Sequence, residues 1–138
     1  MGESLSDLIA FALQSLKAEF TPEETYTPAL YGCTTCGAVP LRLTIMHQSC
    51  STEMDFKGTI LGTCFECANT EEKFHYTRPE SDPGPKEEPS CECGNPYFFM
   101  LGVERFEADG GVPWFFDDGV IVGKCSQCGK CRQFVSYD

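Results

Sequence analysis

The chain has 138 residues, of which 41% are hydrophobic and 12% aromatic, and its formal net charge is −11. The apolar content excludes an intrinsically disordered chain, because disordered chains have too few apolar side chains to bury. The negative charge disfavours nucleic acid as a partner, because the phosphate backbone repels an acidic protein. No stretch approaches the roughly 20 apolar residues of a membrane span, so no membrane partner is expected.

The chain contains 10 cysteines, an excess that either disulfide bonds or bound metal must explain. The cellular compartment separates these two explanations. The N-terminus carries Glu3 and Asp7 where a secretory signal peptide would be basic, and no uninterrupted apolar core follows. We therefore expect a reducing, cytoplasmic location, in which paired cysteines bind metal.

Residues 4–20 have the periodicity of an amphipathic helix, which Ser4 and Asp7 would cap and Thr21-Pro22 would end. Its apolar stripe consists of Leu5, Leu8, Ile9, Ala12, Leu13, Leu16 and Phe20. Two interpretations stay open: the stripe covers the rest of the chain as a lid, or it mediates self-association or docking to a protein partner. Residues 21–30, with Pro22 and Pro28, are predicted to form a connector.

The rest of the sequence predicts short β-strands. Leu41, Leu43 and Ile45 alternate with Arg42 and Thr44, which is the pattern of a half-buried strand. Further strands are predicted at residues 59–63, 73–77, 97–103, 120–124 and 133–137. Residues 47–58 are predicted to be a loop, and Asp117-Asp118-Gly119 a turn.

Two aromatic runs, Tyr97-Phe98-Phe99-Met100 and Trp114-Phe115-Phe116, place large side chains on both faces of a strand pair. One face is expected to be sheet core. The other face must meet the first half of the chain, the N-terminal helix or another molecule.

The second half of the chain repeats the first. The segment from Ile60 to Cys67 (Ile-Leu-Gly-Thr-Cys-Phe-Glu-Cys) aligns without a gap with that from Ile121 to Cys128 (Ile-Val-Gly-Lys-Cys-Ser-Gln-Cys). A proline-rich segment separates the halves and is predicted to be an extended linker. The predicted domains are an N-terminal helix and connector at 1–24, a first unit at 25–77, the linker at 78–90 and a second unit at 91–138.

Eight of the cysteines form four close pairs: Cys33 with Cys36, Cys64 with Cys67, Cys91 with Cys93, and Cys125 with Cys128. A tight turn between two such cysteines lets both sulfurs meet one ion. A glycine after the second cysteine permits the left-handed conformation that the turn often needs. Gly37, Gly94 and Gly129 stand in that position, and Ala68 takes it in the remaining pair. Two pairs separated by a β-excursion supply four tetrahedral sulfurs, which is how structural zinc is held.

These pairs, glycines and strands resemble a tandem of zinc ribbons, a rubredoxin-like arrangement, over residues 31–77 and 90–137. The resemblance implies a small, metal-stabilised, mainly β fold: two duplicated three-stranded antiparallel sheets with an N-terminal α-helix. It implies two zinc ions, the first held by Cys33, Cys36, Cys64 and Cys67 and the second by Cys91, Cys93, Cys125 and Cys128. Iron is the alternative metal, which the absence of a Cys-Pro-x-Cys-Gly motif disfavours. Cys91-Glu92-Cys93 is one residue shorter than the usual spacing.

Four further residues offer alternative ligands or reactive groups. Cys131 follows Cys128 by three residues and is an alternative ligand of the second site, although Gly129 and the repeat favour Cys125 with Cys128. Cys50 and Cys131 are spare thiols, which are more often inert than redox-active. His47 and His75 are not needed as ligands, because a complete set of cysteines exists.

The sequence predicts a protein that is not an enzyme. It has no nucleophile motif and no phosphate-binding loop, the acidic pairs Glu71-Glu72 and Asp117-Asp118 are interpreted as solvated turns, and closed four-sulfur sites leave no position for substrate. We expect a non-catalytic zinc-binding module, an accessory or regulatory protein that docks on a protein partner. The alternatives are a redox-responsive or electron-transfer protein with Fe(Cys)4 or reactive thiols and, further behind, a nucleic-acid-binding zinc ribbon.

Overall fold

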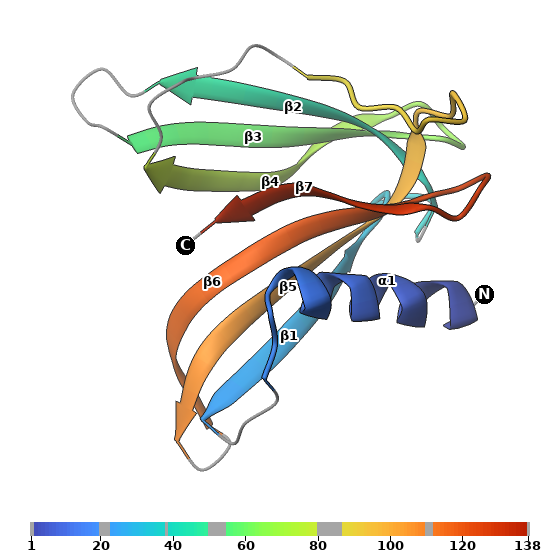
Figure 1. Cartoon of the computed structure of the whole chain (residues 1–138). Coiled ribbons are helices and arrows are strands. Elements are labelled where there is room, and N and C mark those ends of the chain that lie inside the picture. The colour runs from blue at the N-terminus through green and yellow to red at the C-terminus, as the bar shows by residue number, and fades with distance from the viewer. Residues whose placement is uncertain are drawn as a thin grey trace. The chain divides into compact units, whose positions relative to one another are not determined.

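A computed structural model describes residues 2–19, 23–37, 39–49, 55–79, 87–109 and 112–137. In these ranges the chain is mainly β, with an N-terminal helix (Figure 1). The elements are α1 (Gly2–Ser15), β1 (Glu24–Tyr31), β2 (Leu41–Ser49), β3 (Asp55–Cys64), β4 (Thr70–Pro79), β5 (Tyr97–Asp109), β6 (Val112–Cys125) and β7 (Cys131–Tyr137).

The chain packs as two compact units. The first, here called the helical unit, consists of Met1–Leu30, Met100–Lys124 and Gly129–Asp138. The second, the cysteine unit, consists of Tyr31–Phe99 and Cys125–Cys128. The predicted domain boundaries, at residues 24, 77 and 90, follow the sequence repeat. The two compact units are defined by packing instead, so they do not test those boundaries, which stay a prediction.

The cysteine unit is built on an antiparallel meander of β2, β3 and β4. Strand β2 pairs with β3 from Leu41↔Cys64 to Ser49↔Phe56, and the first residues of β5 pair with the other edge of β2. Strand β3 pairs with β4, with a register shift between Ile60 and Leu61. The predicted inward face of β2 is confirmed, because its alternate apolar side chains are buried with those of neighbouring strands: Leu41, Leu43, Ile45, Ile60 and Phe98.

The helical unit combines α1 with β1, β5, β6 and β7. Strand β5 pairs with β1 and β6, and β6 pairs with β7 from Gly119↔Tyr137 to Lys124↔Cys131. This second pairing also shifts register, between Ile121 and Val122. Helix α1 packs on β7 and buries Leu8, Ala12 and Leu16. These three members of the apolar stripe are therefore covered within the chain, as the lid interpretation predicts, whereas Ile9 and Leu13 are half-buried.

The helix ends earlier than predicted, at Ser15 rather than near Phe20. Lys17 adopts the left-handed conformation, with φ of 57°. The amide of Ala18 donates to Leu13 O, and the amide of Lys17 donates to Gln14 O, both at 3.0 Å. This is the hydrogen-bond pattern of a Schellman C-cap, which satisfies the last carbonyls and turns the chain away from the helix axis.

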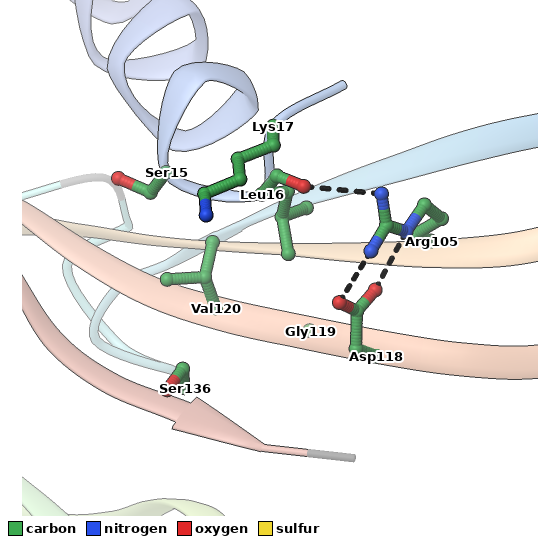
Figure 2. A pocket seen from close by; sticks show the side chains of 8 residues that line it. All are labelled: Ser15, Leu16, Lys17, Arg105, Asp118, Gly119, Val120 and Ser136. Carbon is green, nitrogen blue, oxygen red and sulfur yellow. Dashed lines mark hydrogen bonds and ion pairs between the residues drawn. The ribbon is translucent and has the colours of Figure 1, made fainter. Parts of the chain in front are cut away.

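Arg105 ties the end of α1 to the strands (Figure 2). Its Nε and Nη2 atoms donate to the two carboxylate oxygens of Asp118 at 2.8 and 2.6 Å, and Nη1 donates to Leu16 O at 3.0 Å. The hydrogen bond to Asp118 raises the pKa of the guanidinium further above its ordinary value. The prediction of a turn at 117–119 is therefore wrong, because β6 runs through these residues and Asp118 binds Arg105.

Two other predicted irregular segments contain strands. Residues 24–30 of the predicted connector belong to β1, which pairs with β5 and tolerates Pro28 because proline is compatible with an edge strand. In the predicted loop at 47–58, β2 continues to Ser49 and β3 begins at Asp55, since the ladder between them extends to Ser49↔Phe56. Residues 50–54, and residues 80–86 of the predicted linker, lie outside the described residues.

Within the described ranges, no helix is both long and apolar enough to cross a membrane.

Candidate metal centre

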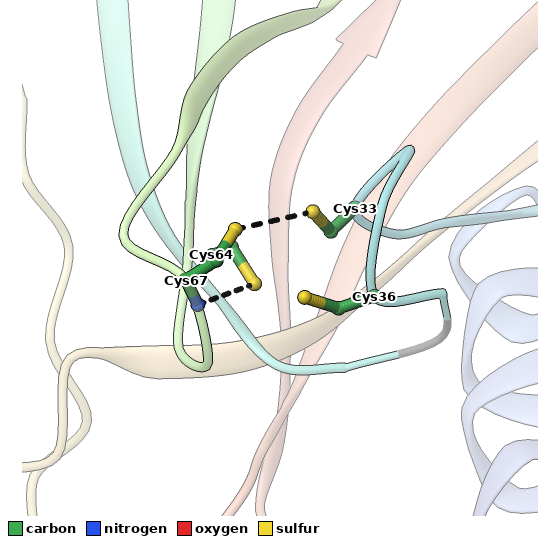
Figure 3. A group of neighbouring side chains, drawn as sticks. All are labelled: Cys33, Cys36, Cys64 and Cys67. Atoms are coloured by element: carbon green, nitrogen blue, oxygen red, sulfur yellow. Dashed lines mark hydrogen bonds between the residues drawn. The ribbon is translucent and has the colours of Figure 1, made fainter.

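The first group of four cysteines is assembled from two turns of the cysteine unit (Figure 3). Cys33 and Cys36 lie between β1 and β2, Cys64 ends β3, and Cys67 lies on the turn into β4. Their four Sγ atoms lie within 4.8 Å of one another, and those of Cys33 and Cys67 are 3.6 Å apart. A tetrahedral ion with Zn–S bonds of about 2.3 Å needs sulfurs about 3.8 Å apart, so the four thiols fit such an ion.

The first turn presents its backbone to a sulfur. The amides of Cys33 and Gly37 each donate to the other residue's carbonyl at 2.8 Å, which closes the turn, and Gly37 has the left-handed φ of 86°. The Thr35 amide donates to Cys33 Sγ at 3.4 Å. Hydrogen bonds from the backbone of Cys36 and Thr35 lower the pKa of Cys33 to about 7. The fold thus favours a thiolate here before any ion binds.

The second turn has the same form without a glycine. Ala68 takes the left-handed conformation, with φ of 61°, and its amide donates to Cys64 O at 3.0 Å. The amides of Glu66 and Cys67 donate to Cys64 Sγ at 3.2 and 3.4 Å. The conformation expected of a glycine is therefore present, although alanine adopts it.

The four sulfurs cannot all be thiolates without a cation. Burial, with the neighbouring thiols, raises the pKa of Cys36 to about 12. The backbone amide of Asn69 lowers the pKa of Cys67, but hydrogen bonding with Cys33 and burial outweigh it, and the pKa is raised. A divalent cation can replace these protons, because it supplies the positive charge that stabilises four thiolates together.

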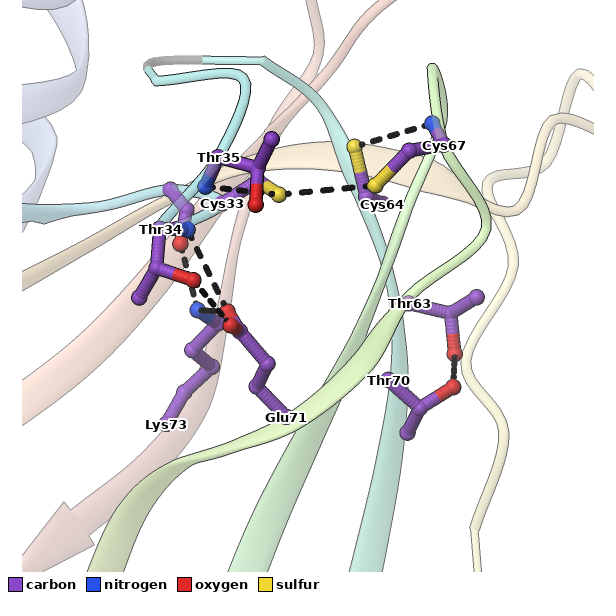
Figure 4. A network of polar contacts seen from close by, with 10 residues as sticks. Cys33, Thr34, Thr35, Thr63, Cys64, Cys67, Thr70, Glu71 and Lys73 are labelled. Atoms are coloured by element: carbon purple, nitrogen blue, oxygen red, sulfur yellow. Dashed lines mark hydrogen bonds and ion pairs between the residues drawn. The ribbon is translucent and has the colours of Figure 1, made fainter.

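A charged network braces the first turn from β4 (Figure 4). The carboxylate of Glu71 accepts hydrogen bonds from the hydroxyl and the amide of Thr34, which lies between the ligand candidates of the turn. Lys73 donates to Glu71 and to Gly32 O. The hydrogen bond from Lys73, followed by that from Thr34, lowers the pKa of Glu71 to about 2. The interpretation of Glu71 as part of a solvated turn is therefore wrong.

The second group lies in the same unit. Cys91 and Cys93 precede β5, Cys125 ends β6, and Cys128 lies on the turn into β7. Their Sγ atoms also lie within 4.8 Å of one another, with 3.3 Å between Cys91 and Cys128 and 3.6 Å between Cys93 and Cys125. The shorter spacing still brings both sulfurs of the first pair to the group.

A glycine allows this shorter turn to close. Gly94 has φ of 94°, and its amide donates to Cys91 O at 2.8 Å. The amide of Cys91 in turn donates to Asn95 O at 2.9 Å. The turn therefore closes with one residue fewer between its cysteines.

Asn95 is a site residue that the sequence analysis missed. It is buried, and its Nδ2 atom lies 3.3 Å from Cys125 Sγ, 2.8 Å from Ser126 Oγ and 2.9 Å from Tyr97 O. Burial opposes ionisation of Cys125, but the hydrogen bonds from Asn95 and from the backbone of Cys128 and Gln127 outweigh it and lower the pKa to about 6. The sequence does contain a pattern that indicates this role: Asn-Pro directly follows Cys-Gly, which is typical of a turn in which the Asn side chain forms hydrogen bonds.

The remaining candidates lie elsewhere. Cys131 begins β7 opposite Lys124 and belongs to neither group of four; burial raises the pKa of its thiol. Cys50 lies outside the described residues, and so do the side chains of His47 and His75. The structure thus brings together the eight paired cysteines and leaves Cys131 apart from them.

No protein-family model, curated protein or solved structure gives a significant match to this chain.

Proposed function

We propose that the chain is a non-catalytic metal-binding module that holds two zinc ions through four cysteine thiolates each. The observation that carries the proposal is the assembly of eight cysteines, from four separate turns, into two groups whose sulfurs lie within 4.8 Å. Each group already supplies the four ligands of a closed tetrahedral site, so no coordination position is left for a substrate or an activated water. The ions would act as structural links between turns.

A duplicated ribbon arrangement is part of this proposal, and the strand registers support it. The pairing of β3 with β4 shifts between Ile60 and Leu61, and that of β6 with β7 shifts between Ile121 and Val122. These positions are equivalent in the sequence repeat, each four residues before a cysteine of its site. Irregularities of strand pairing such as bulges are kept within families, so a register shift at equivalent positions of both halves is expected from duplication.

The test is the metal content of the purified full-length chain, measured by elemental analysis together with the visible absorption spectrum. Two colourless zinc ions per chain are expected. Cys36→Ser and Cys93→Ser should each lose one ion, whereas Cys131→Ser, which changes a cysteine outside both groups, should keep two.

Other outcomes would change the proposal. Iron with visible thiolate-to-metal bands would replace zinc and bring electron transfer forward, because four thiolates suit either metal. A chain that retains no metal when its thiols are kept reduced would overturn the proposal altogether.

A further inference from the structure

The first half of β6 exposes three large apolar side chains. Val112, Trp114 and Phe115 are 65%, 64% and 56% exposed, and the two aromatic rings lie 5.7 Å apart. We call these residues the β6 apolar face. Contiguous exposed apolar side chains of this kind, rimmed by polar groups, mark interaction sites.

Trp114 also lines a groove of about 540 Å³ whose other lining residues, apart from Ala108, are acidic. The groove is formed by Trp114, Ala108, Glu19, Glu23, Glu24, Glu107 and Asp117. The nearby guanidinium of Arg105 is directed mainly at Asp118 and lies 3.5 Å from Glu24 and from Asp117. In the described part of the chain, the carboxylates of Glu19, Glu23 and Glu107 have no ion-pair partner. The groove therefore has an excess of negative charge beside an aromatic wall.

We propose that this groove and the β6 apolar face bind a basic segment of a partner protein. A lysine or arginine side chain of that segment enters the groove, where the carboxylates attract it and the face of the Trp114 indole binds it by a cation–π contact. Apolar residues next to the cation cover Val112 and Phe115. The proposal builds on the protein-interaction role expected of the module. The partner would bind to the helical unit, whereas both groups of cysteines lie in the cysteine unit.

Charge complementarity selects this occupant over others. A second copy of the chain carries a net charge of −11, so two acidic grooves would repel each other. Nucleic acid and anionic membranes are repelled for the same reason. An uncharged apolar partner would cover the face but would leave the carboxylates beneath it desolvated and unpaired, which costs free energy.

Binding of a fluorescent peptide to the metal-loaded, full-length chain tests the proposal. The probe is a short Gly/Ser peptide carrying arginines and leucines, and its matched control has glutamate in place of each arginine. Fluorescence anisotropy should show binding of the basic peptide alone, weakening as salt is added. Trp114→Ser should weaken binding about tenfold or more, as expected for an aromatic residue at the centre of an interface. The double variant Glu23→Gln/Glu107→Gln should weaken binding and reduce its salt dependence.

Two control variants match these changes. Phe65→Ser removes another exposed aromatic side chain, 57% exposed in the cysteine unit, and should leave peptide binding unchanged. Glu66→Gln/Glu88→Gln removes two exposed carboxylates that do not line the groove and should have no effect beyond the small change in net charge.

Several results would overturn the inference: equal binding of both peptides, unchanged binding by Trp114→Ser, or equal losses in the control variants. Self-association in analytical ultracentrifugation that Trp114→Ser abolishes would assign the face to a second copy instead. The metal content of each sample is measured in parallel. If a chain with two zinc ions does not bind the basic peptide, this inference is contradicted and the metal proposal stands. If a chain without metal binds the peptide, the metal proposal is contradicted and this inference stands.

Discussion

Asn95 shows at the residue scale how a neutral side chain can support a thiolate. Its amide group reaches the Cys125 sulfur and Ser126 Oγ from inside the protein, where water does not compete. Hydrogen bonds of this kind orient metal ligands and make their charged forms more stable, so their loss is felt in metal affinity as well as in folding. The same side chain therefore contributes to both properties.

We predict that Asn95→Ala lowers zinc affinity of the second site by about 10- to 100-fold, because the Cys125 thiolate loses a donor. The free energy of unfolding should fall by about 1–3 kcal/mol, since Ser126 Oγ and Tyr97 O lose their partner. Competition with a chromophoric chelator and denaturant unfolding measure the two effects. Asn69→Ala is the matched control, because Asn69 is exposed and acts through its backbone carbonyl and amide, which the substitution keeps. Similar losses in both variants would contradict the role of the Asn95 side chain.

Glu71 is the second residue whose charge matters to a site. Its folded-state pKa of about 2 lies below its ordinary value of 4.5, so its contribution to stability is present above pH 4.5 and is lost as the pH falls toward 2. We predict that Glu71→Gln lowers the thermal midpoint of the zinc-loaded protein by the same amount throughout the range from pH 8 to about pH 5. Calorimetry at several pH values measures this difference. Glu66→Gln, an exposed carboxylate on the neighbouring turn, should have little effect.

Two outcomes would contradict this role of Glu71. No difference in midpoint anywhere between pH 8 and pH 5 would mean that the folded-state pKa of Glu71 lies near its ordinary value, and that the contacts with Thr34 and Lys73 contribute little. An equal loss from Glu66→Gln would indicate a general effect of net charge.

At the scale of the elements, the turns that carry the cysteines are specified by single backbone conformations. Gly37 and Ala68 hold equivalent places after their cysteine pairs, with φ of 86° and 61°. A β-carbon built on Gly37 would have no atom within 4 Å, so a substitution there is resisted by the backbone conformation alone. A left-handed residue other than glycine costs roughly 1–2 kcal/mol.

These two positions give predictions of opposite sign. Gly37→Ala should lower the free energy of unfolding by about 1–2 kcal/mol, and Ala68→Gly should leave it unchanged or raise it by up to about 1 kcal/mol, since glycine relieves the strain but loses more entropy on folding. Denaturant unfolding of the zinc-loaded variants measures both. A stability loss from Ala68→Gly as large as that from Gly37→Ala would show that the methyl group of Ala68 has a packing role that outweighs its strain.

At the scale of the whole molecule, the two units should respond differently to loss of metal. Both groups of cysteines belong to the cysteine unit, whereas α1 buries its apolar stripe in the helical unit. Small domains that depend on metal lose folding free energy when the ion is removed, because the binding energy is part of the folding energy.

We predict that a chelator, under reducing conditions, lowers the thermal midpoint and removes hydrogen-exchange protection first from residues 31–49 and 55–79. Protection in residues 8–15 of α1 and in residues 100–109 of β5 should persist longer, since apolar packing holds them. Hydrogen exchange with mass spectrometry, followed by re-addition of zinc to test reversibility, gives the measurement. Simultaneous loss of protection in both units would show that they fold as one cooperative body, and no change in either would argue against a structural role for the metal.

The sequence by itself determined the eight cysteines of the two groups and the inward face of β2. Both depend on local chemistry: cysteines two or three residues apart share a turn, and alternation from Leu41 to Ile45 sets which face of a strand is buried. The sequence also predicted most strands, although not β1.

The tertiary structure decided what depends on partners distant in the chain. Strand β6 passes through Asp117 and Asp118 because Arg105, 13 residues before Asp118, binds that carboxylate, and Glu71 becomes a brace because it meets Thr34, 37 residues away. Phe98 and Trp114 both lie in aromatic runs of the sequence, but they differ in burial: Phe98 is fully buried and Trp114 is 64% exposed. Apolarity favours burial of both, but only packing fixes which side chains find a covering surface and which are left for a partner.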